Sequence, residues 1–236
     1  NALRRLGAID FATTIAPGVR DVLLTGKAME ATKRKDAQGR FVYDAVVMDA
    51  PPTGRVARFL NVNSEVAGLA KVGPIRNQAD AVMGVIKSRI TTVHLVTLLE
   101  EMPVQETVDG IAELRAAELP VGGIFVNMVR QPLLPPEALA EAAAGSLDQN
   151  HIAQGLVDAG LAPPSGKRTK RVAAWADALA HEAAEHAERV ALETQERARL
   201  RATGRPMIEL PYLSEGIDVG ALYTLAAHMH ENGVGE

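Results

Sequence analysis

The chain has 236 residues, of which 47% are hydrophobic, 23% are charged and 3% are aromatic, and its formal net charge is −4. These values are typical of a globular protein and exclude disordered, collagen-like and coiled-coil chains. The acidic charge and the scarcity of aromatic rings also argue against nucleic-acid binding, and the absence of cysteine excludes disulfides and thiol chemistry.

The apolar runs and the first residues of the chain bear on its cellular location and on its completeness. No run of 18 apolar residues is present, and no basic stretch followed by an apolar one opens the chain, so we expect no membrane-spanning helix and no signal peptide. A cytoplasmic protein without direct membrane insertion is the simplest interpretation. The first residue is Asn1 rather than Met, and we therefore expect the chain to be part of a longer protein.

The first 50 residues predict a helix, a polar turn and then a strand. Residues 1–40 have helical spacing interrupted by Pro17 and end in a charged turn. Tyr43–Met48 is a short apolar run that predicts a buried strand, with Asp49 at its open carboxyl end. A Pro-Pro-Thr-Gly turn follows, and we expect a short helix over residues 55–60.

Two later apolar runs, residues 91–99 and 121–129, also predict strands. The residues between them, 103–119, predict a helix with proline in its first turn. Because strand, helix and strand follow within about 35 residues, they predict a crossover unit in a parallel sheet. A fourth strand at 207–211 and a last helix at 219–230 complete an α/β fold class.

Three stretches carry helical spacing without any strand signal. We expect residues 62–90 and 135–165 to form a helical subdomain above the sheet. Residues 168–203 predict one long helix that ends near Gly204 and Pro206. Its predicted apolar stripe consists of Val172, Trp175, Leu179, Ala183, His186 and Val190.

Three short motif matches fail on inspection. Residues 24–27 and 164–167 resemble phosphate-binding loops, but both lack the glycine five residues before the Gly-Lys pair and the Ser or Thr after it. His181 and His186 suggest a zinc helix, yet they are five residues apart and so about 140° around the helix axis. Solvated turns and ordinary His–Glu pairs explain these matches better.

The segment from Val46 to Arg55 is the motif that we retain as a candidate nucleotide-binding site. In an open parallel sheet ligands bind at the carboxyl edge, and a carboxylate there can hold Mg²⁺ through water, opposite phosphate oxygens. Gly54 lets backbone N–H groups approach an anion, and the following helix would offer its N-terminus to phosphate. The alternative is that Asp49 only caps this helix while the prolines stop the strand.

Residues 43–55 resemble the switch II segment of the arsenical-pump and tail-anchored-protein-targeting ATPases, a family that usually reads Asp-Thr-Ala-Pro-Thr-Gly-His. Residues 124–127 and 208–216 are similar to that family's adenine-recognition strand and adenine-covering loop, and residues 97–107 are similar to its strand–Glu–helix element. The resemblance is strongest to the actinobacterial branch of anion-transporting ATPases. It implies a P-loop NTPase-like core of the deviant Walker type.

The resemblance implies ATP and Mg²⁺ as cofactors and assigns roles residue by residue. Asp49 would be the catalytic residue that lies near Mg²⁺, through water, and couples it to switch II. Thr53 and Gly54 would sense the γ-phosphate through backbone contacts. The residues expected around adenine are Asn127 at its edge and Pro211, Tyr212 and Leu213 along its face. Asn127 could instead only cap the turn after its strand.

The chain departs from the family pattern in several places. The family's P-loop and its switch I aspartate would lie upstream of this sequence, so we expect residues 1–236 to form one truncated ATPase domain that is inactive alone. Arg55 stands where many members have His. Without cysteine, neither a thiol metalloid site nor a zinc-bridged dimer can form, and no Met-rich helix predicts a groove for transmembrane clients.

We expect the complete protein to couple Mg-ATP hydrolysis to movement of the helical subdomain for transport or targeting. The resemblance further implies a homo- or heterodimer and a membrane-protein or transporter partner. Two alternatives stay open: a non-catalytic regulatory or scaffold subunit, and a partition-type positioning ATPase. The second is less favoured because residues 222–236 contain no Lys or Arg, whereas positioning proteins often end in a basic amphipathic helix.

Overall fold

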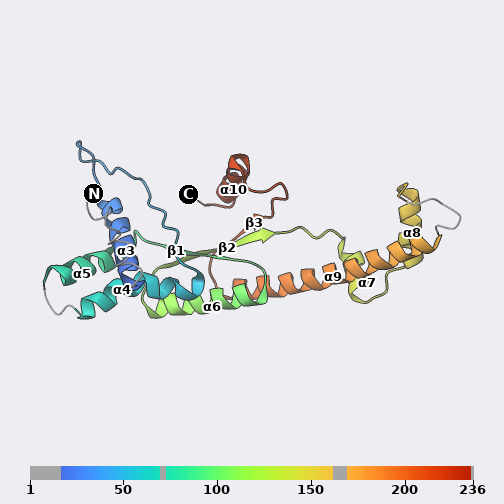
Figure 1. Ribbon diagram of the computed structural model, residues 1–236, viewed down its shortest axis with the longest axis horizontal. Coiled ribbons are helices and arrows are strands. Elements are labelled where there is room, and N and C mark those ends of the chain that lie inside the picture. The colour runs from blue at the N-terminus through green and yellow to red at the C-terminus, as the bar shows by residue number, and fades with distance from the viewer. Residues whose placement is uncertain (1–16, 70–72, 162–168, 235–236) are drawn as a thin grey trace, which may run out of the picture. The chain divides into compact units, whose positions relative to one another are not determined.

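The computed structural model describes residues 17–69, 73–161 and 169–234 (Figure 1). Its contacts divide the chain into two units, residues 1–97, 105–125 and 205–208 in the first and residues 98–104, 126–204 and 209–236 in the second. In chain order the elements are α3 (Pro17–Lys33), α4 (Thr53–Leu69), α5 (Pro74–Ile86), β1 (Val93–Thr97), α6 (Glu101–Ala116), β2 (Val121–Val129), α7 (Pro136–Ala143), α8 (Gln149–Asp158), α9 (Thr169–Ala202), β3 (Met207–Pro211) and α10 (Val219–Glu231).

The sheet has the order β1-β2-β3 and is parallel. At its start, the Val93 N–H donates to the Pro120 carbonyl at 2.8 Å. Between β2 and β3, the Ile124 N–H donates to Pro206 and the Tyr212 N–H donates to Val129, each at 2.8 Å, so both strands advance in the same direction. The predicted α/β fold class with a parallel sheet is confirmed.

Helix α6 forms the crossover between β1 and β2 and nearly matches the predicted helix at 103–119. Its buried positions Val104, Thr107, Ile111 and Leu114 are three or four residues apart, so they share one face of the helix. The helix ends at Ala116, and the turn after it contains Glu118, whose φ of 59° is left-handed, while the Leu119 N–H donates to the Leu114 carbonyl at 2.8 Å.

Helices α3, α4 and α5 pack together in the first unit (Figure 1). Helix α5 buries Ala79, Val82, Met83 and Ile86, which have helical spacing. A polar contact joins the other two helices, because the Asn63 Nδ2 of α4 donates to the Thr25 Oγ1 of α3 at 2.7 Å. Both side chains are at most 2% exposed, so this hydrogen bond is made inside the packed group.

Helix α9 spans nearly the whole range predicted for the long helix, and the predicted stripe is confirmed in part, because Val172 is buried and Ala183, His186 and Val190 are half-buried. Trp175 and Leu179 are 37% and 41% exposed, whereas Ala176 and Ala187 are buried. Helices α7 and α8 pack against α9 within the second unit (Figure 1). The prediction was wrong only for the two largest side chains of the stripe, Trp175 and Leu179, because small residues such as Ala176 and Ala187 permit close approach of helices and are the ones buried there.

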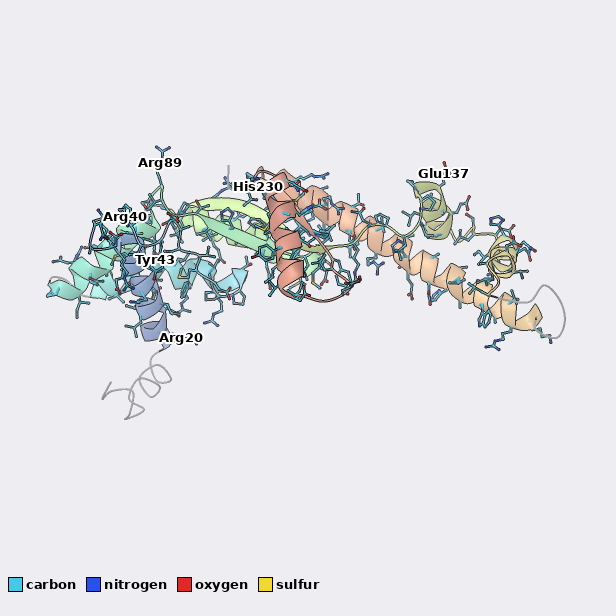
Figure 2. All side chains as sticks on the ribbon, turned by 90° about the horizontal axis from the view of Figure 1, so that it is seen from above. Arg20, Arg40, Tyr43, Arg89, Glu137 and His230 are labelled. Atoms are coloured by element: carbon cyan, nitrogen blue, oxygen red, sulfur yellow. The ribbon has the colours of Figure 1, made fainter. Side chains whose placement is uncertain are left out.

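The strand predicted at Tyr43–Met48 is absent: residues 45–52 are irregular, and Tyr43 and Val47 are exposed. Figure 1 shows this segment as an extended trace between α3 and α4, and Figure 2 labels Tyr43 on it. A strand persists only where its backbone groups pair with a neighbour. In the described part of the chain the nearest pairing is the isolated bridge of Lys35 with Phe41.

The expected helical subdomain stays a prediction. Its first stretch, residues 62–90, contains the end of α4 and α5 in the first unit. Its second stretch, residues 135–165, contains α7 and α8 in the second unit, and the last of these residues lie outside the described ones, as does the loop-like match at 164–167. Among the described helices, none combines the length and apolar character needed to cross a bilayer.

Candidate functional site

Asp49 lies in the irregular segment that precedes α4. It therefore does not follow a paired strand, which corrects the expectation that a buried strand delivers it to the edge of the sheet. Its carboxylate is exposed, and no ion pair within the described residues ties it down. The side chain is thus accessible to a hydrated cation.

Thr53 is the first residue of α4, and Gly54 is the second. Pro51 and Pro52 precede them, and the Arg55 N–H donates to the Pro52 carbonyl at 2.8 Å, which closes the turn into the helix. Helix α4 begins earlier and runs longer than the predicted helix at 55–60. Since the first N–H groups of a helix lack intrahelical acceptors and carry a partial positive charge, Thr53 and Gly54 lie at a natural anion-binding end.

Asn127 and residues 211–213 lie at the carboxyl ends of two neighbouring strands, β2 and β3, in the second unit. The hydrogen bond from the Tyr212 N–H to the Val129 carbonyl extends the ladder past the end of β3. The structure therefore brings the four predicted adenine-binding residues, Asn127, Pro211, Tyr212 and Leu213, to the same edge of the sheet. Tyr212 is 40% exposed.

The backbone next to Asn127 is unusual. Met128 has a φ of 57°, in the left-handed region that L residues rarely adopt, and its N–H donates to the Asn127 Oδ1 at 3.0 Å. This contact ties the Asn127 side chain to the backbone of its own strand. It does not exclude adenine recognition, because the second lone pair of Oδ1 and both amide protons of Asn127 are additional to it. Such backbone strain is commonest at binding sites.

Arg130 is a residue that the sequence reasoning missed. Its guanidinium carbon lies 4.4 Å from the centre of the Tyr212 ring, which is the geometry of a cation–π contact. Arg130 directly follows β2, and a polar side chain at the carboxyl end of a strand was the signal that could have identified it. The pair covers one face of the Tyr212 ring.

The strand that carries this edge is anchored by side chains from two helices. Arg197 of α9 makes a bidentate pair with Glu209 of β3, with distances of 2.7 and 3.0 Å between nitrogen and oxygen. The two side chains are only 20% and 29% exposed, so the pair is largely removed from solvent. The ring of His228 in α10, the helix that also carries His230 (Figure 2), lies 2.8 Å from the Glu209 carbonyl oxygen.

Two other features bear on ligands. Within the described residues, no three His, Asp or Glu side chains gather into a group that could hold a metal ion.

A groove of about 680 Å³ lies in the first unit among α3, α4 and α5, with Val22, Met29 and Val82 along it and Lys27 and Glu30 beside them. None of the predicted site residues lines this groove.

Comparison with known proteins gives the chain relatives that are named ATPases. ATPase BagA of Mycobacterium tuberculosis is 46% identical over 233 residues, which cover 99% of this chain and 66% of BagA. A Mycobacterium bovis protein named as an ATPase matches to the same extent. ATPase GET3 of Kluyveromyces lactis is 27% identical over 151 residues, covering 52% of this chain and 43% of GET3. No protein-family model matches the chain.

These similarities support an ATPase of the same general type as GET3 and the arsenical-pump ATPases. The actinobacterial sources of the first relatives agree with the branch that the motifs resemble. The parallel sheet and its crossover helix fit the P-loop NTPase-like core that a GET3 relative implies. The chain spans 66% of the length of BagA.

Proposed function

We propose that the complete protein is a Mg²⁺-dependent ATPase that works as a switch, with Asp49–Gly54 as its moving segment. The observation that carries the proposal is the similarity of almost the whole chain to ATPase BagA. The local structure supports it, because Asp49 is exposed next to the N-terminus of α4, where anions are bound favourably.

The residues present fit a magnesium ion that is held mainly by phosphate oxygens and water. Mg²⁺ in nucleotide sites takes one or two carboxylates and keeps several waters, and Asp49 offers one accessible carboxylate. When bound, the ion would neutralise charge that develops on the transferred phosphoryl group. Asp49 would orient a metal-bound water, while the N–H groups of Thr53 and Gly54 would contact the γ-phosphate.

The carboxyl edge of β2 and β3 would bind the adenine ring. The amide of Asn127 offers both a donor and an acceptor, which suits the edge of adenine. Tyr212, flanked in sequence by Pro211 and Leu213, would stack on the face of the adenine ring. Arg130 would then have to leave the Tyr212 ring or remain on the ring face opposite to the base.

Loss of the γ-phosphate would release the segment at Asp49–Gly54 and move the expected helical subdomain, residues 62–90 and 135–165. The proposed cycle takes place in the cytoplasm in a homo- or heterodimer that acts on a membrane-protein or transporter partner, in transport or targeting. Residues 1–236 alone would not hydrolyse ATP, because they contain no P-loop lysine to bind the phosphates.

The test compares Asp49→Asn with the unchanged complete protein. We expect ATP turnover to fall by on the order of a hundredfold or more, because the carboxylate that orients the metal-bound water is neutralised. Calorimetry with Mg-ATP would show whether binding survives the change. The matched control is Asp44→Asn, since Asp44 is exposed on the same segment and has no proposed role.

Two results would overturn this proposal: no binding of Mg-ATP by the complete protein, or unchanged turnover in Asp49→Asn. Binding of Mg-ATP without turnover by the unchanged protein would instead support the non-catalytic subunit considered above.

A further inference from the structure

Gly110, in the interior of α6, lies directly against Thr53. A Cβ atom built on Gly110 would be 2.6 Å from the Thr53 Cγ2, 3.7 Å from its carbonyl oxygen and 4.0 Å from its Cβ. Real Cβ atoms essentially never approach another heavy atom to less than 3.0 Å. Any side chain at position 110 would therefore displace Thr53 or α6.

The close contact joins a buried position of α6 to a half-buried residue at the start of α4. Gly110 is itself buried on α6, next to Ile111, and Val56 in the first turn of α4 is 3% exposed. Thr53 is β-branched, so few rotations about its χ1 angle are open to it. A methyl group at position 110 can therefore be accommodated only if the Thr53 side chain, the first turn of α4 or helix α6 moves.

Gly110 differs from other glycines within the described helices. Gly26 of α3, Gly84 of α5 and Gly155 of α8 have no heavy atom within 4 Å of a built Cβ. Glycine is less favourable than alanine in a helix interior, so a buried glycine in tight contact has a reason in packing. At position 110 that reason is the side chain of Thr53.

We propose that Gly110 is a positioning residue: its missing side chain forms a seat for Thr53 and so fixes the first turn of α4. This inference rests on the proposed function for its consequence, because Thr53 and Gly54 are the residues assigned to the γ-phosphate. The seat holds their N–H groups where the phosphate is bound. Filling it would move those donors and lower the turnover rate more than it weakens substrate binding.

The test is a double-mutant cycle of Gly110→Ala with Thr53→Ser, because serine keeps the hydroxyl and removes the Cγ2 that a Cβ at position 110 would meet. In the complete protein, Gly110→Ala is expected to lower kcat by on the order of tenfold to a hundredfold with little change in KM. On the Thr53→Ser background the same change should lower kcat by less than about threefold.

A second readout does not depend on ATP. In residues 1–236, Gly110→Ala should speed amide hydrogen exchange at residues 57–60, the first amides of α4 that have acceptors within the helix, by about tenfold or more, and much less on the Thr53→Ser background. The matched control is Gly84→Ala, which adds the same methyl group to a helix of the same unit where a Cβ meets nothing, and which should leave this exchange unchanged.

Each result decides one of the two proposals. Unchanged exchange at residues 57–60 in Gly110→Ala, or equal effects on both backgrounds, would overturn the seat even in an active ATPase. If Gly110→Ala does not fold, the double variant must recover folding, and failure to do so also overturns the seat. An unchanged complete protein without ATP turnover would refute the proposed function, while the exchange measurements would still decide the seat.

Discussion

At the scale of single residues, Asp36 illustrates how a short loop is held by one carboxylate. Its Oδ1 accepts from the N–H groups of Arg40 and Gln38, each at 2.9 Å, and its Oδ2 accepts from the Arg40 Nε at 3.1 Å. The backbone hydrogen bond from Arg40 is the main reason that the pKa of Asp36 lies below its ordinary value of 3.8. Gly39, with a φ of 80°, completes the turn.

The lowered pKa predicts an acid-sensitive loop. Because the folded pKa is below the unfolded one, the stabilisation is fully present above the unfolded pKa and is lost as the pH falls through the folded pKa. In an NMR titration, the Asp36 carboxyl signal should have its midpoint below that of the same residue in a free peptide of residues 34–42. The amide signals of Gln38 and Arg40 should move with the same midpoint. Equal midpoints in chain and peptide would contradict this account.

Several residues show what could not be predicted from the sequence. Glu196 lies in the charged half of α9, and its position suggests a solvated face, yet it is fully buried and its Oε2 accepts from Arg199 at 2.8 Å. Gly110 was visible only as a glycine inside a predicted helix. Both depend on which neighbour packs against a helix, and a single sequence does not contain that information. Asn127 and Tyr212 were predicted from the family resemblance, and the structure places both near strand ends, while their binding role stays a prediction.

At the scale of elements, prediction succeeded where local signals and pairing agree. The strands at 121–129 and 207–211 were predicted at their observed bounds, since apolar runs flanked by proline and polar residues suit strands with neighbours in a parallel sheet. The run at Tyr43–Met48 carries the same local signals but pairs with no neighbour among the described residues. Strand formation depends on long-range pairing, so local pattern alone was insufficient there.

The contact between α3 and α4 gives a prediction at this scale. Thr25→Val removes the acceptor of the buried Asn63 amide, and we expect it to lower the free energy of unfolding by about 1–3 kcal/mol. Combining it with Asn63→Leu should cost less than the sum of the two single changes, because no unsatisfied polar group then remains. Urea denaturation of residues 1–236 measures all three.

The matched control for this contact is Thr32→Val. Thr32 also lies on α3, but its hydroxyl donates to the Met29 carbonyl of its own helix rather than to α4. This change should alter the free energy of unfolding by less than about 0.5 kcal/mol. Equal losses in Thr25→Val and Thr32→Val would show that the hydrogen bond between the two helices contributes nothing specific.

At the scale of the whole molecule, the exposed segment at Tyr43–Met48 is the feature to explain. Val47 is 95% exposed, and Tyr43 and Val46 are 46% and 37% exposed, in a run whose residue types favour a strand. The curated relatives are longer than this chain, which spans 66% of BagA. We infer that in a protein of the relatives' length this segment pairs with a further strand.

Amide hydrogen exchange tests this inference. In residues 1–236 the amides of residues 43–48 should exchange quickly, because they lie in an exposed, irregular segment. In the complete protein the pairing amides should be protected by about a hundredfold or more, since a paired strand opens only with its sheet. The amides of Ile124 and Val126, buried in β2, are the internal control and should be protected in both forms. If residues 43–48 exchange equally fast in both forms, the segment is no strand in either, and Asp49 must reach a nucleotide from an unpaired loop.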